Sequence, residues 1–312
     1  MADFVHVPVM LKECMQGLNV KNGGVYFDGT LGGAGHSSEI LRLSSPNGFL
    51  LATDLDDYAL KRADERLSDY MGRYKLVKSN FKNFLEVKEN AGIDEFDGIL
   101  LDLGVSSFQL DDKSRGFSYM AGDETLDMRM DESKPFSAID VINGYDENNL
   151  KRIISEYGEE RFAFSIAKNI VKERKISPIT TVGRLNEIIS QSIPKKFQKG
   201  GHPSKKTFQA IRIEVNGELD GLYETVIAMA RSLKKGGRLA IMTFHSLEDR
   251  IVKRAFKELE TDCVCPKSLP VCVCGKKKEI EIITKRPVTA GEEELGNNPR
   301  AASAKLRVAE KV

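Results

Sequence analysis

Short apolar runs alternate with segments of helical periodicity over the first hundred residues. Runs typical of buried strands occur at 25–28, 49–54, 74–77 and 96–103. Between them, residues 37–43 and 58–70 carry apolar side chains at three- and four-residue steps, as one face of a helix does. Strands that alternate with helices in this way predict an α/β sheet whose strands run parallel.

The alternation stops near residue 108. Helical spacing of apolar side chains, without a buried strand, continues through 161–175, 182–189 and 208–215. Thr180 and Thr181 stand before the second of these segments, where a hydroxyl can cap a helix. We therefore predict a helical insertion at 108–212, within a cofactor-binding domain formed by 1–107 and 213–312.

The α/β pattern resumes after the insertion. The expected elements are a helix at 219–233, a strand at 238–244, a helix at 247–259 and strand-like segments at 279–285 and 304–309. Gly236-Gly237 is expected to end the first of these helices, because glycine commonly follows a helix. The last two segments predict an antiparallel edge to the sheet.

Charge is balanced over the chain as a whole but not along it. The formal net charge is +1, yet residues 161–212 hold 12 Lys/Arg against 2 Asp/Glu, whereas 92–160 hold 17 Asp/Glu against 6 Lys/Arg. A basic block suits a phosphate-rich partner such as RNA. A pair of solvated helix faces is the alternative explanation.

The sequence contains no segment typical of membrane insertion or export. No run of about 18 apolar residues occurs, which argues against a membrane span. Residues 1–10 lack a basic segment followed by an apolar stretch, so no signal peptide is predicted. We therefore expect a cytoplasmic protein without membrane association.

Four of the five cysteines form two Cys-x-Cys pairs, Cys263/Cys265 and Cys272/Cys274. Structural zinc sites usually use Cys-x2-Cys or wider spacing. A small metal knuckle, a redox pair and reduced surface cysteines all remain open, and no metal ligand is assigned from the sequence.

A glycine-rich loop follows the first predicted strand, from Asp28 to His36 (DGTLGGAGH). Glycines allow the backbone to approach a ligand closely, and ligands of open α/β sheets bind beyond the carboxyl ends of the strands. Asp54 ends the second strand 19 residues after Gly35, where a carboxylate can accept hydrogen bonds from both hydroxyls of a ribose. Asp102 ends the fourth strand and is expected to face the same crevice. Together these residues predict a ligand that contains a nucleoside.

Two features favour S-adenosylmethionine over NAD as that ligand. The dinucleotide fingerprint Gly-x-Gly-x-x-Gly is not cleanly present, because Gly33-Ala34-Gly35-His36-Ser37 is followed by Ser38. Asp28 also stands before the loop, where a carboxylate suits the ammonium and sulfonium of S-adenosylmethionine and would repel the pyrophosphate of NAD. A nicotinamide dehydrogenase remains the less favoured alternative.

Seven segments follow one another along nearly the whole chain as they do in one enzyme family. They are 4–11 (FVHVPVML), 28–37 (DGTLGGAGHS), 102–109 (DLGVSSFQ), 126–130 (LDMRM), 206–213 (KTFQAIRI), 243–250 (TFHSLEDR) and 297–307 (NNPRAASAKLR). With these segments the chain closely resembles the bacterial ribosomal RNA small subunit methyltransferase H family, RsmH or MraW. The resemblance implies a Rossmann-like class I methyltransferase sheet with a helical insertion domain.

The resemblance also implies an activity and a partner. The activity is methylation of the exocyclic N4 of a specific cytidine near the decoding site, with S-adenosylmethionine as the methyl donor. The partner is 16S ribosomal RNA within the small ribosomal subunit. The cofactor contacts that the resemblance implies are Ala34, Gly35, His36, Asp54, Phe81, Asp102 and Gln109.

The amine of cytosine is a poor nucleophile because its lone pair is delocalised into the ring. An acceptor for the amine hydrogens would favour a pyramidal nitrogen, and no strong base is needed because the methylated nitrogen loses its proton easily. The candidates for this catalytic role are Asp102, Ser106, Ser107 and His245. A purely structural histidine is the alternative for His245.

The target base has to leave its stack to reach the cofactor, so a second surface has to hold the RNA backbone. We expect the helical insertion to supply it through Lys195, Lys196, Lys199, Lys205, Lys206 and Arg212. The rival functions are a methyltransferase for DNA or another RNA, a dehydrogenase, and an RNA-binding assembly factor that does not catalyse. The sequence leaves the oligomeric state open, and a homodimer is retained as one alternative.

Overall fold

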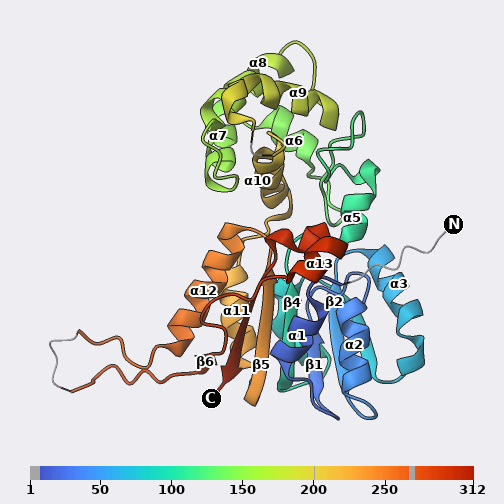
Figure 1. The fold of residues 1–312 in the computed structure, drawn as a ribbon, viewed down its shortest axis with the longest axis vertical. Helices are drawn as coiled ribbons and strands as arrows, with labels where there is room; N and C mark the ends of the chain where they lie inside the picture. Colours follow the sequence, from blue (N-terminus) through green and yellow to red (C-terminus); the bar gives the residue numbers. More distant parts are fainter. Residues whose placement is uncertain (1–7, 200, 267–270) are drawn as a thin grey trace. The chain divides into compact units, whose positions relative to one another are not determined.

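The computed structural model describes residues 8–199, 201–266 and 271–312 (Figure 1). The chain divides into two compact units, one formed by Met1–Gly104 with Leu219–Val312 and the other by Val105–Glu218. The predicted insertion, 108–212, lies inside the second unit. Residues 1–7, which contain most of the leader segment considered above and the start of the first family segment, lie outside the described residues.

The first unit is built on a seven-stranded sheet in the order β3-β2-β1-β4-β5-β7-β6. Its strands are β1 (Val25–Asp28), β2 (Phe49–Asp54), β3 (Tyr74–Lys78), β4 (Phe96–Asp102), β5 (Leu233–Thr243), β6 (Ile280–Ile282) and β7 (Lys305–Lys311). The first five strands run parallel, and β7 runs antiparallel to both β5 and β6. This order is that of Rossmann-like class I methyltransferases, so the predicted fold class and antiparallel edge are confirmed.

Two apolar layers cover the sheet, because alternate side chains of each strand point to opposite faces. Tyr26 and Leu50 enter one layer, whereas their neighbours Phe27 and Leu51 enter the other. The first layer includes side chains of α1, α2 and α3, and the second includes side chains of α4, α11 and α12. The helices of this unit are α1 (Leu11–Leu18), α2 (Gly35–Leu43), α3 (Asp57–Arg66), α4 (Phe84–Asn90), α11 (Leu222–Arg231), α12 (Ser246–Glu260) and α13 (Glu292–Asn297).

Strand β5 begins earlier than the sequence predicted. The pair Gly236-Gly237, expected to end the preceding helix, lies inside this strand. Gly236 has a φ of +75°, and a Cβ on Gly237 would lie 2.9 Å from the carbonyl oxygen of Phe96. The register between β4 and β5 shifts at the same place, between Phe96 and Gly98. The glycines therefore mark a β-bulge where two backbones approach closely, and their interpretation as a helix end is wrong.

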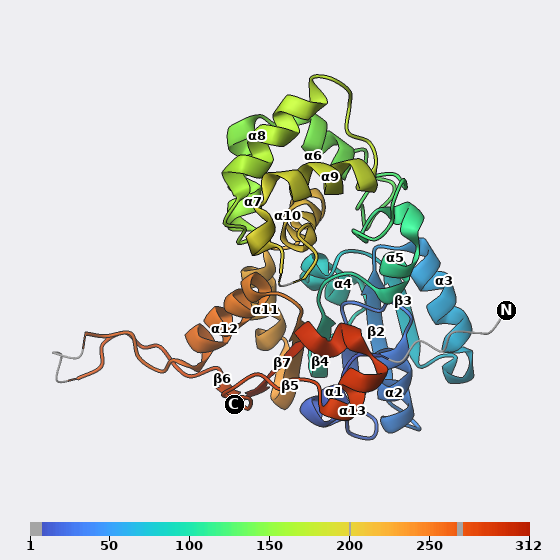
Figure 2. The same cartoon turned by 45° about the horizontal axis from the view of Figure 1, so that its top comes forward.

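The second unit is helical (Figure 2). Its helices are α5 (Ser107–Asp111), α6 (Ala138–Gly144), α7 (Glu147–Glu156), α8 (Ala163–Arg174), α9 (Val182–Ser192) and α10 (Lys205–Asn216). Ile166, Leu185 and Ile211, which mark the predicted apolar faces, are buried in one cluster. Thr181 caps α9, as predicted, since its Oγ1 accepts a hydrogen bond from the backbone N–H of Arg184 at 3.3 Å. Among the described residues of both units, no helix is long and apolar enough to cross a membrane.

Candidate active site

Three aspartates end three neighbouring strands of the sheet. Asp28, Asp54 and Asp102 are the last residues of β1, β2 and β4, and the sheet order places β1 between the other two. In the register of the parallel pairs, Asp28 lies opposite Ala52 and Leu100, so each outer strand extends two residues further. The carboxyl ends of parallel strands meet at one edge, where α/β sheets bind their ligands. The structure thus brings together the three acids that the sequence singled out.

The loop between β1 and α2 needs glycine for two different reasons. A Cβ on Gly29 would lie 2.4 Å from Cδ2 of Leu101, and a Cβ on Gly35 would lie 2.1 Å from Cγ of Pro8. These two positions are filled by neighbouring side chains. By contrast, a Cβ on Gly33 would meet no atom within 4 Å among the described residues. The loop is therefore packed closely on one side and open at Gly33, where a ligand can approach the backbone.

Hydrogen bonds fasten this loop to the ends of β2 and β4. The Gly29 N–H donates to the carbonyl of Leu100 at 3.0 Å, and the Leu31 N–H donates to that of Thr53 at 3.1 Å. The Thr53 hydroxyl donates to the carbonyl of Gly29 at 3.1 Å. The backbone of the loop is thus fixed before any ligand arrives, so little ordering entropy is lost on binding.

Asp28 is buried beneath the loop, with 2% of its surface exposed. Its Oδ2 accepts a hydrogen bond from the Ser37 hydroxyl at 2.7 Å, and its Oδ1 accepts one from the Thr30 N–H at 3.1 Å. Burial raises the pKa of Asp28, and these hydrogen bonds oppose the shift. Both oxygens therefore accept hydrogen bonds within the loop and help to shape it, and the expectation that Asp28 faces a cationic ligand stays a prediction.

Asp54 is only partly buried, at the start of the turn that leads into α3. Its Oδ2 accepts a hydrogen bond from the Gly32 N–H at 2.8 Å, and its Oδ1 accepts one from the Asp56 N–H at 3.0 Å. Burial raises the pKa of Asp54, and both backbone hydrogen bonds oppose the shift. A carboxylate has about four lone-pair sites, so these backbone contacts and a further one from Leu55 leave room for another donor, such as a ribose hydroxyl.

Asp102 differs from the other two acids because one of its oxygens is not engaged. Oδ1 is buried and has no hydrogen-bond partner among the residues that the structure describes, while Oδ2 lies 3.9 Å from Nδ1 of His36. Burial raises the pKa of Asp102 well above its usual range, and the negative charges of Asp28 and Glu248 raise it further. An unsatisfied buried acceptor is costly, so this oxygen is suited to accept a hydrogen from a ligand.

His36 connects the first turn of α2 to the same site. Its Nε2 lies 3.0 Å from the carbonyl oxygen of Val9, which can only accept, so that nitrogen carries the proton of the bond. The ring is 7% exposed, and its other nitrogen is the one that faces Asp102. His36 therefore lies at the predicted cofactor loop, held by backbone on one side and next to a carboxylate on the other.

Ala34 and Phe81, two cofactor contacts implied by the resemblance, also lie at this loop. Ala34 is the residue before α2 and adopts a left-handed φ of +56°. Phe81 begins a short turn after β3, and its Cβ would lie 2.9 Å from a Cβ placed on Gly29. The glycine loop and the short turn after β3 are thus neighbours in the first unit.

Three residues of the loop region were not singled out from the sequence. The Asp102 N–H donates to the Thr30 hydroxyl at 2.6 Å, Ser37 bonds Asp28 as described above, and the Arg66 guanidinium donates to the carbonyl of Gly33 at 3.0 Å. The spacing of Asp28 and Thr30 is a recognisable signal, because an aspartate often accepts from the N–H two residues later. No local pattern predicts the contact from Arg66, which comes from a different helix.

His245 stands directly before α12, beyond the end of β5. Its Nδ1 accepts from the Glu248 N–H at 3.5 Å, its Nε2 lies 3.1 Å from Oε1 of Glu248, and Glu248 accepts in return from the His245 N–H at 3.3 Å. This reciprocal arrangement is a capping box. The structural alternative for His245 is therefore realised as a helix cap, and its catalytic role stays a prediction.

Ser106, Ser107 and Gln109 belong to the second unit. Ser106 caps α5, since its Oγ accepts from the Gln109 N–H at 3.2 Å, and the Gln109 side-chain oxygen accepts from the Ser106 N–H at 3.0 Å. Gln109 is 6% exposed. The side chain of Ser107 lies outside the described part of the structure. The catalytic role of the two serines and the cofactor contact of Gln109 stay predictions.

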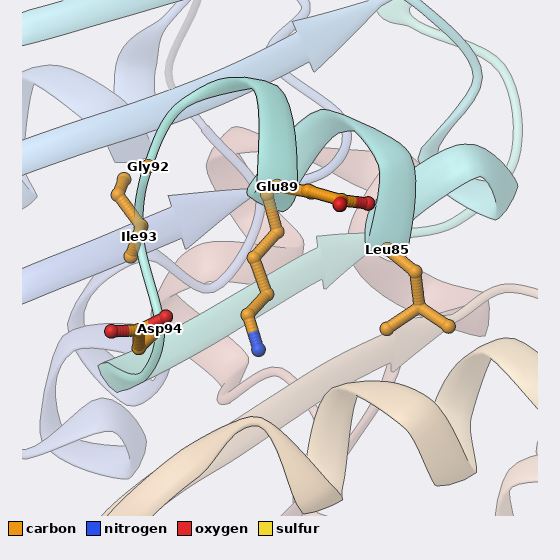
Figure 3. A pocket seen from close by; sticks show the side chains of 6 residues that line it. Leu85, Glu89, Gly92, Ile93 and Asp94 are labelled. Carbon is orange, nitrogen blue, oxygen red and sulfur yellow. The ribbon is translucent and has the colours of Figure 1, made fainter.

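A surface hollow lies at the other end of the sheet (Figure 3). It is lined by Leu85, Lys88, Glu89, Gly92, Ile93 and Asp94. The last of these residues stand just before β4, so the hollow adjoins the amino end of that strand. It shares no residue with the predicted site and lies at the edge where parallel sheets do not bind their ligands.

Comparison with known proteins decides the family of this chain. A sequence model of the MraW methylase family matches residues 3–312. The chain belongs to the MraW methylase family. A protein named ribosomal RNA small subunit methyltransferase H, from Clostridioides difficile (strain 630), is 53% identical over 311 residues, which cover 99% of this chain and 100% of that protein. The resemblance inferred from the sequence segments is thereby confirmed.

Two further proteins of the same name match at similar identity. The one from Clostridium botulinum (strain Loch Maree / Type A3) is 54% identical over 310 residues, covering 99% of this chain and 100% of that protein. The one from Brevibacillus brevis (strain 47 / JCM 6285 / NBRC 100599) is 51% identical over 310 residues, covering 99% and 98%. The match to the MraW methylase family thus spans both units of the chain.

Segments of the MraW methylase family that are distant in sequence meet in the first unit. Arg307 of segment 297–307 forms a bidentate ion pair with Asp249 of segment 243–250, with N–O distances of 2.6 and 3.1 Å. Arg307 is 7% exposed, and Lys305 lies 3.9 Å from the same carboxylate. This pair joins β7 to α12.

Proposed function

We propose that this protein methylates the exocyclic N4 of a specific cytidine in 16S ribosomal RNA, near the decoding site, with S-adenosylmethionine as cofactor. The observation that carries the proposal is the full-length match to the MraW methylase family together with the unengaged buried oxygen of Asp102 beside the glycine loop. The full-length relatives named ribosomal RNA small subunit methyltransferase H support the choice of substrate.

The residues at the strand ends fit this cofactor. When bound, S-adenosylmethionine supplies an electrophilic methyl group on a positively charged sulfur. Asp54 would accept hydrogen bonds from the ribose hydroxyls through the lone pairs that its backbone contacts leave free. The open face of the loop at Gly33 gives the ligand access to backbone, and Phe81 flanks the adenine side of the loop in this proposal. The three acids make the edge electronegative, which suits a cationic ligand and opposes a pyrophosphate.

Asp102 is the proposed acceptor for the cytosine amine. Its raised pKa makes the carboxylate a better acceptor than an ordinary aspartate. Holding the amine in line with the methyl group would supply much of the rate, because positioning alone accounts for several powers of ten in well-oriented reactions. An oxygen fixed in a buried site accepts the amine hydrogen without further reorganisation.

The second unit offers a surface suited to RNA. Lys195, Lys196 and Lys199 are exposed, and Phe197 between them is 45% exposed. The Phe197 ring lies 4.9 Å from the Arg161 guanidinium carbon and 5.1 Å from the Lys196 ammonium. Cations beside an exposed aromatic ring are typical of surfaces that hold phosphates and stack bases. We therefore assign this lysine–phenylalanine cluster, Lys195–Lys199, to substrate binding.

Arg212 is a less suitable member of that surface than the sequence suggested. Its guanidinium forms a bidentate ion pair with Glu218, with both N–O distances at 2.8 Å, and its side chain is 16% exposed. Lys206 donates to the carbonyl of Glu159 at 2.9 Å but remains exposed. The proposed RNA surface therefore keeps the lysines and leaves Arg212 with a structural role.

Reversing the charge of the cluster is expected to weaken RNA binding. The triple variant Lys195→Glu/Lys196→Glu/Lys199→Glu should lose roughly tenfold or more in affinity at 100 mM salt, and its salt dependence should be flatter, because phosphate contacts release counterions. Titration of a fluorescent 16S RNA fragment at several salt concentrations measures both quantities.

The matched control reverses three exposed lysines of the same unit, Lys168, Lys172 and Lys175, on or next to α8. This control changes the net charge equally and should stay within about twofold of the wild type. Equal losses in both triple variants would contradict the assignment, because they would show a dependence on net charge alone.

The function itself is tested by nucleoside analysis. Mass spectrometry of 16S ribosomal RNA from cells with and without this protein should show loss of N4-methylcytidine at one position when it is absent. Purified protein should restore that nucleoside on isolated small subunits with S-adenosylmethionine and should leave naked DNA unmodified. An unchanged nucleoside profile would contradict the proposal, whereas methylation of DNA or of another RNA would support the rival substrates.

The proposed setting is the cytoplasm, where small ribosomal subunits are assembled, with 16S ribosomal RNA as the partner. The described residues contain no helix that could span a membrane, in keeping with this setting. Sedimentation of the purified protein at several concentrations distinguishes a monomer from the homodimer retained as an alternative.

A further inference from the structure

A long arm joins α12 to β6, and its described residues form neither helix nor strand. It comprises residues 261–279, of which 261–266 and 271–279 are described, and its two limbs run side by side away from the sheet in Figure 1. The apolar side chains of these residues do not form a core, since Val264, Val271 and Val273 are 63%, 70% and 76% exposed. A segment of this kind needs another source of order.

Four cysteine sulfurs converge within this arm. Cys263 and Cys265 come from the outgoing limb, and Cys272 and Cys274 come from the returning limb. The sulfur of Cys272 lies 3.5 Å from that of Cys263, 4.0 Å from that of Cys265 and 3.5 Å from that of Cys274. The sulfurs of Cys263 and Cys274 are 3.9 Å apart, and all four lie within 4.8 Å of one another.

These separations match a tetrahedral metal–thiolate site. A zinc–sulfur bond of about 2.3 Å places the corners of a tetrahedron about 3.8 Å apart, which is the middle of the observed range. A disulfide would need a pair of sulfurs at about 2.05 Å, whereas the four cysteines are free. The geometry thus favours four separate ligands around one centre over two covalent pairs.

The backbone of the arm donates to the same sulfurs in a nearly symmetric pattern. The Val264 N–H, between the first two cysteines, donates to Sγ of Cys274 at 3.5 Å. The Val273 N–H, between the last two, donates to Sγ of Cys265 at 3.4 Å. Hydrogen bonds from backbone N–H groups stabilise the thiolate form of cysteine, which is the form that binds metal.

Each Cys-x-Cys pair can present both of its sulfurs to one centre. Side chains two residues apart in an extended chain point to the same side of it. In the structure the backbone bends at Cys265 and Cys274, and the Cys265 N–H donates back to Sγ of Cys263 at 3.4 Å. Both sulfurs of each pair therefore lie at the same centre.

We propose that Cys263, Cys265, Cys272 and Cys274 bind one Zn²⁺ ion and that this ion holds the two limbs of the arm together. Four protein ligands leave no open position, so the site is structural rather than catalytic. Thiolate ligands in a tetrahedron select zinc over magnesium, calcium or manganese, which prefer oxygen. The complex of four thiolates with Zn²⁺ carries two negative charges, and the lysines at 276–278 directly after the last ligand offset them.

Metal analysis of the full chain tests this proposal without reference to methyl transfer. Protein purified under reducing conditions without chelator should contain about one zinc per chain by mass spectrometry of the elements. The variant Cys265→Ser/Cys274→Ser should lose nearly all of it. The control Cys14→Ala removes the remaining cysteine, which is buried in the core of the first unit, and should keep the full zinc content.

Two further measurements make the result decisive. Co²⁺ bound in place of zinc should give the intense visible absorption of a tetrahedral thiolate site, and the double variant should not show it. Chelation of the zinc should release four reactive thiols and speed tryptic cleavage at the lysines of 276–278. The proposal would be overturned by four reactive thiols and no zinc before chelation. It would also be overturned by disulfides, seen as an intact mass lower by two hydrogens for each one. Iron in place of zinc would overturn it as well.

Discussion

Replacing Asp102 by asparagine is expected to lower kcat for methyl transfer to the RNA by a factor of about 10² to 10⁴, the usual contribution of a positioned proton acceptor. Asparagine keeps the size of the side chain but turns one oxygen into a donor. Oδ1 of Asp102 is buried and has no hydrogen-bond partner among the described residues. The substitution therefore alters the atom that is proposed to accept the amine hydrogen. Affinity for S-adenosylhomocysteine should change much less than kcat. Single-turnover methylation and calorimetric titration measure the two quantities separately.

The pH dependence of the reaction gives an independent measure of the same group. Burial and the charge of Asp28 raise the pKa of Asp102, so its carboxyl keeps its proton to a higher pH than an ordinary aspartate, whose pKa is about 3.9. Because the ionised form is the stronger hydrogen-bond acceptor, kcat/KM should fall as the pH drops through the raised pKa. The Asp102→Asn variant should lack this acid limb. A variant with normal kcat and an unchanged pH profile would contradict the proposed role.

Asp97 offers a matched control on the same strand. It lies at the amino end of β4 and accepts hydrogen bonds from the Val25 N–H and the Lys234 ammonium, each at 2.8 Å. Asp97→Asn should therefore affect stability by roughly 1 kcal/mol and leave kcat and the pH profile close to those of the wild type. Comparable losses of kcat in both variants would point to a general distortion of β4.

The sequence correctly placed two acids at the ends of their strands, where a single strand end determines the answer. Asp54 and Asp102 each follow an apolar run, and a parallel sheet brings such ends together whatever the details of the fold. The role of Asp28 was not predictable in this way. It depends on Ser37 and Thr30, whose hydrogen bonds turn the carboxylate inward, and no pattern in the strand itself indicates the direction.

The remaining differences share one cause, which is that local patterns omit tertiary contacts. Gly236-Gly237 resembles a helix end in sequence, but the backbone of β4 approaches at this point and makes a bulge. The partner that decides the outcome there becomes visible only in the folded chain. His245 caps α12 through a local pairing with Glu248 three residues later, and its catalytic role stays a prediction.

The boundary of the helical insertion shows a related limit. Apolar periodicity placed the insertion at 108–212, whereas the second compact unit is Val105–Glu218. The additional residues at the end include Glu218, which is paired with Arg212. Ion pairs of this kind extend a compact unit beyond its last apolar contact. The spacing of apolar residues cannot predict them, because both partners are charged.

Replacing Asp54 by alanine is expected to weaken the binding of S-adenosylhomocysteine by roughly 100-fold or more. A hydrogen bond to a charged group contributes about 1.5 to 3 kcal/mol, and two ribose hydroxyls would lose such a partner, while every 1.4 kcal/mol is about tenfold in Kd. Because burial raises the pKa of Asp54, affinity in the wild type should decline on acidification at a higher pH than for an ordinary carboxylate. Isothermal titration at several pH values measures both effects.

The variant also removes the acceptor of the Gly32 N–H, so loss of loop structure has to be separated from loss of the ribose contact. The 2′,3′-dideoxy analogue of S-adenosylhomocysteine serves this purpose in a double-mutant cycle. If Asp54 holds the hydroxyls, the wild type should bind the analogue weakly. The Asp54→Ala variant should then bind the analogue with nearly the same low affinity as the wild type. Asp56→Ala is the matched control. Asp56 lies two residues after Asp54, and its side chain caps α3 by accepting a hydrogen bond from the Tyr58 N–H. This variant should change the affinity by less than about threefold. Additive losses for the two ligands on Asp54→Ala would show that Asp54 supports the loop alone and would remove it from the cofactor site.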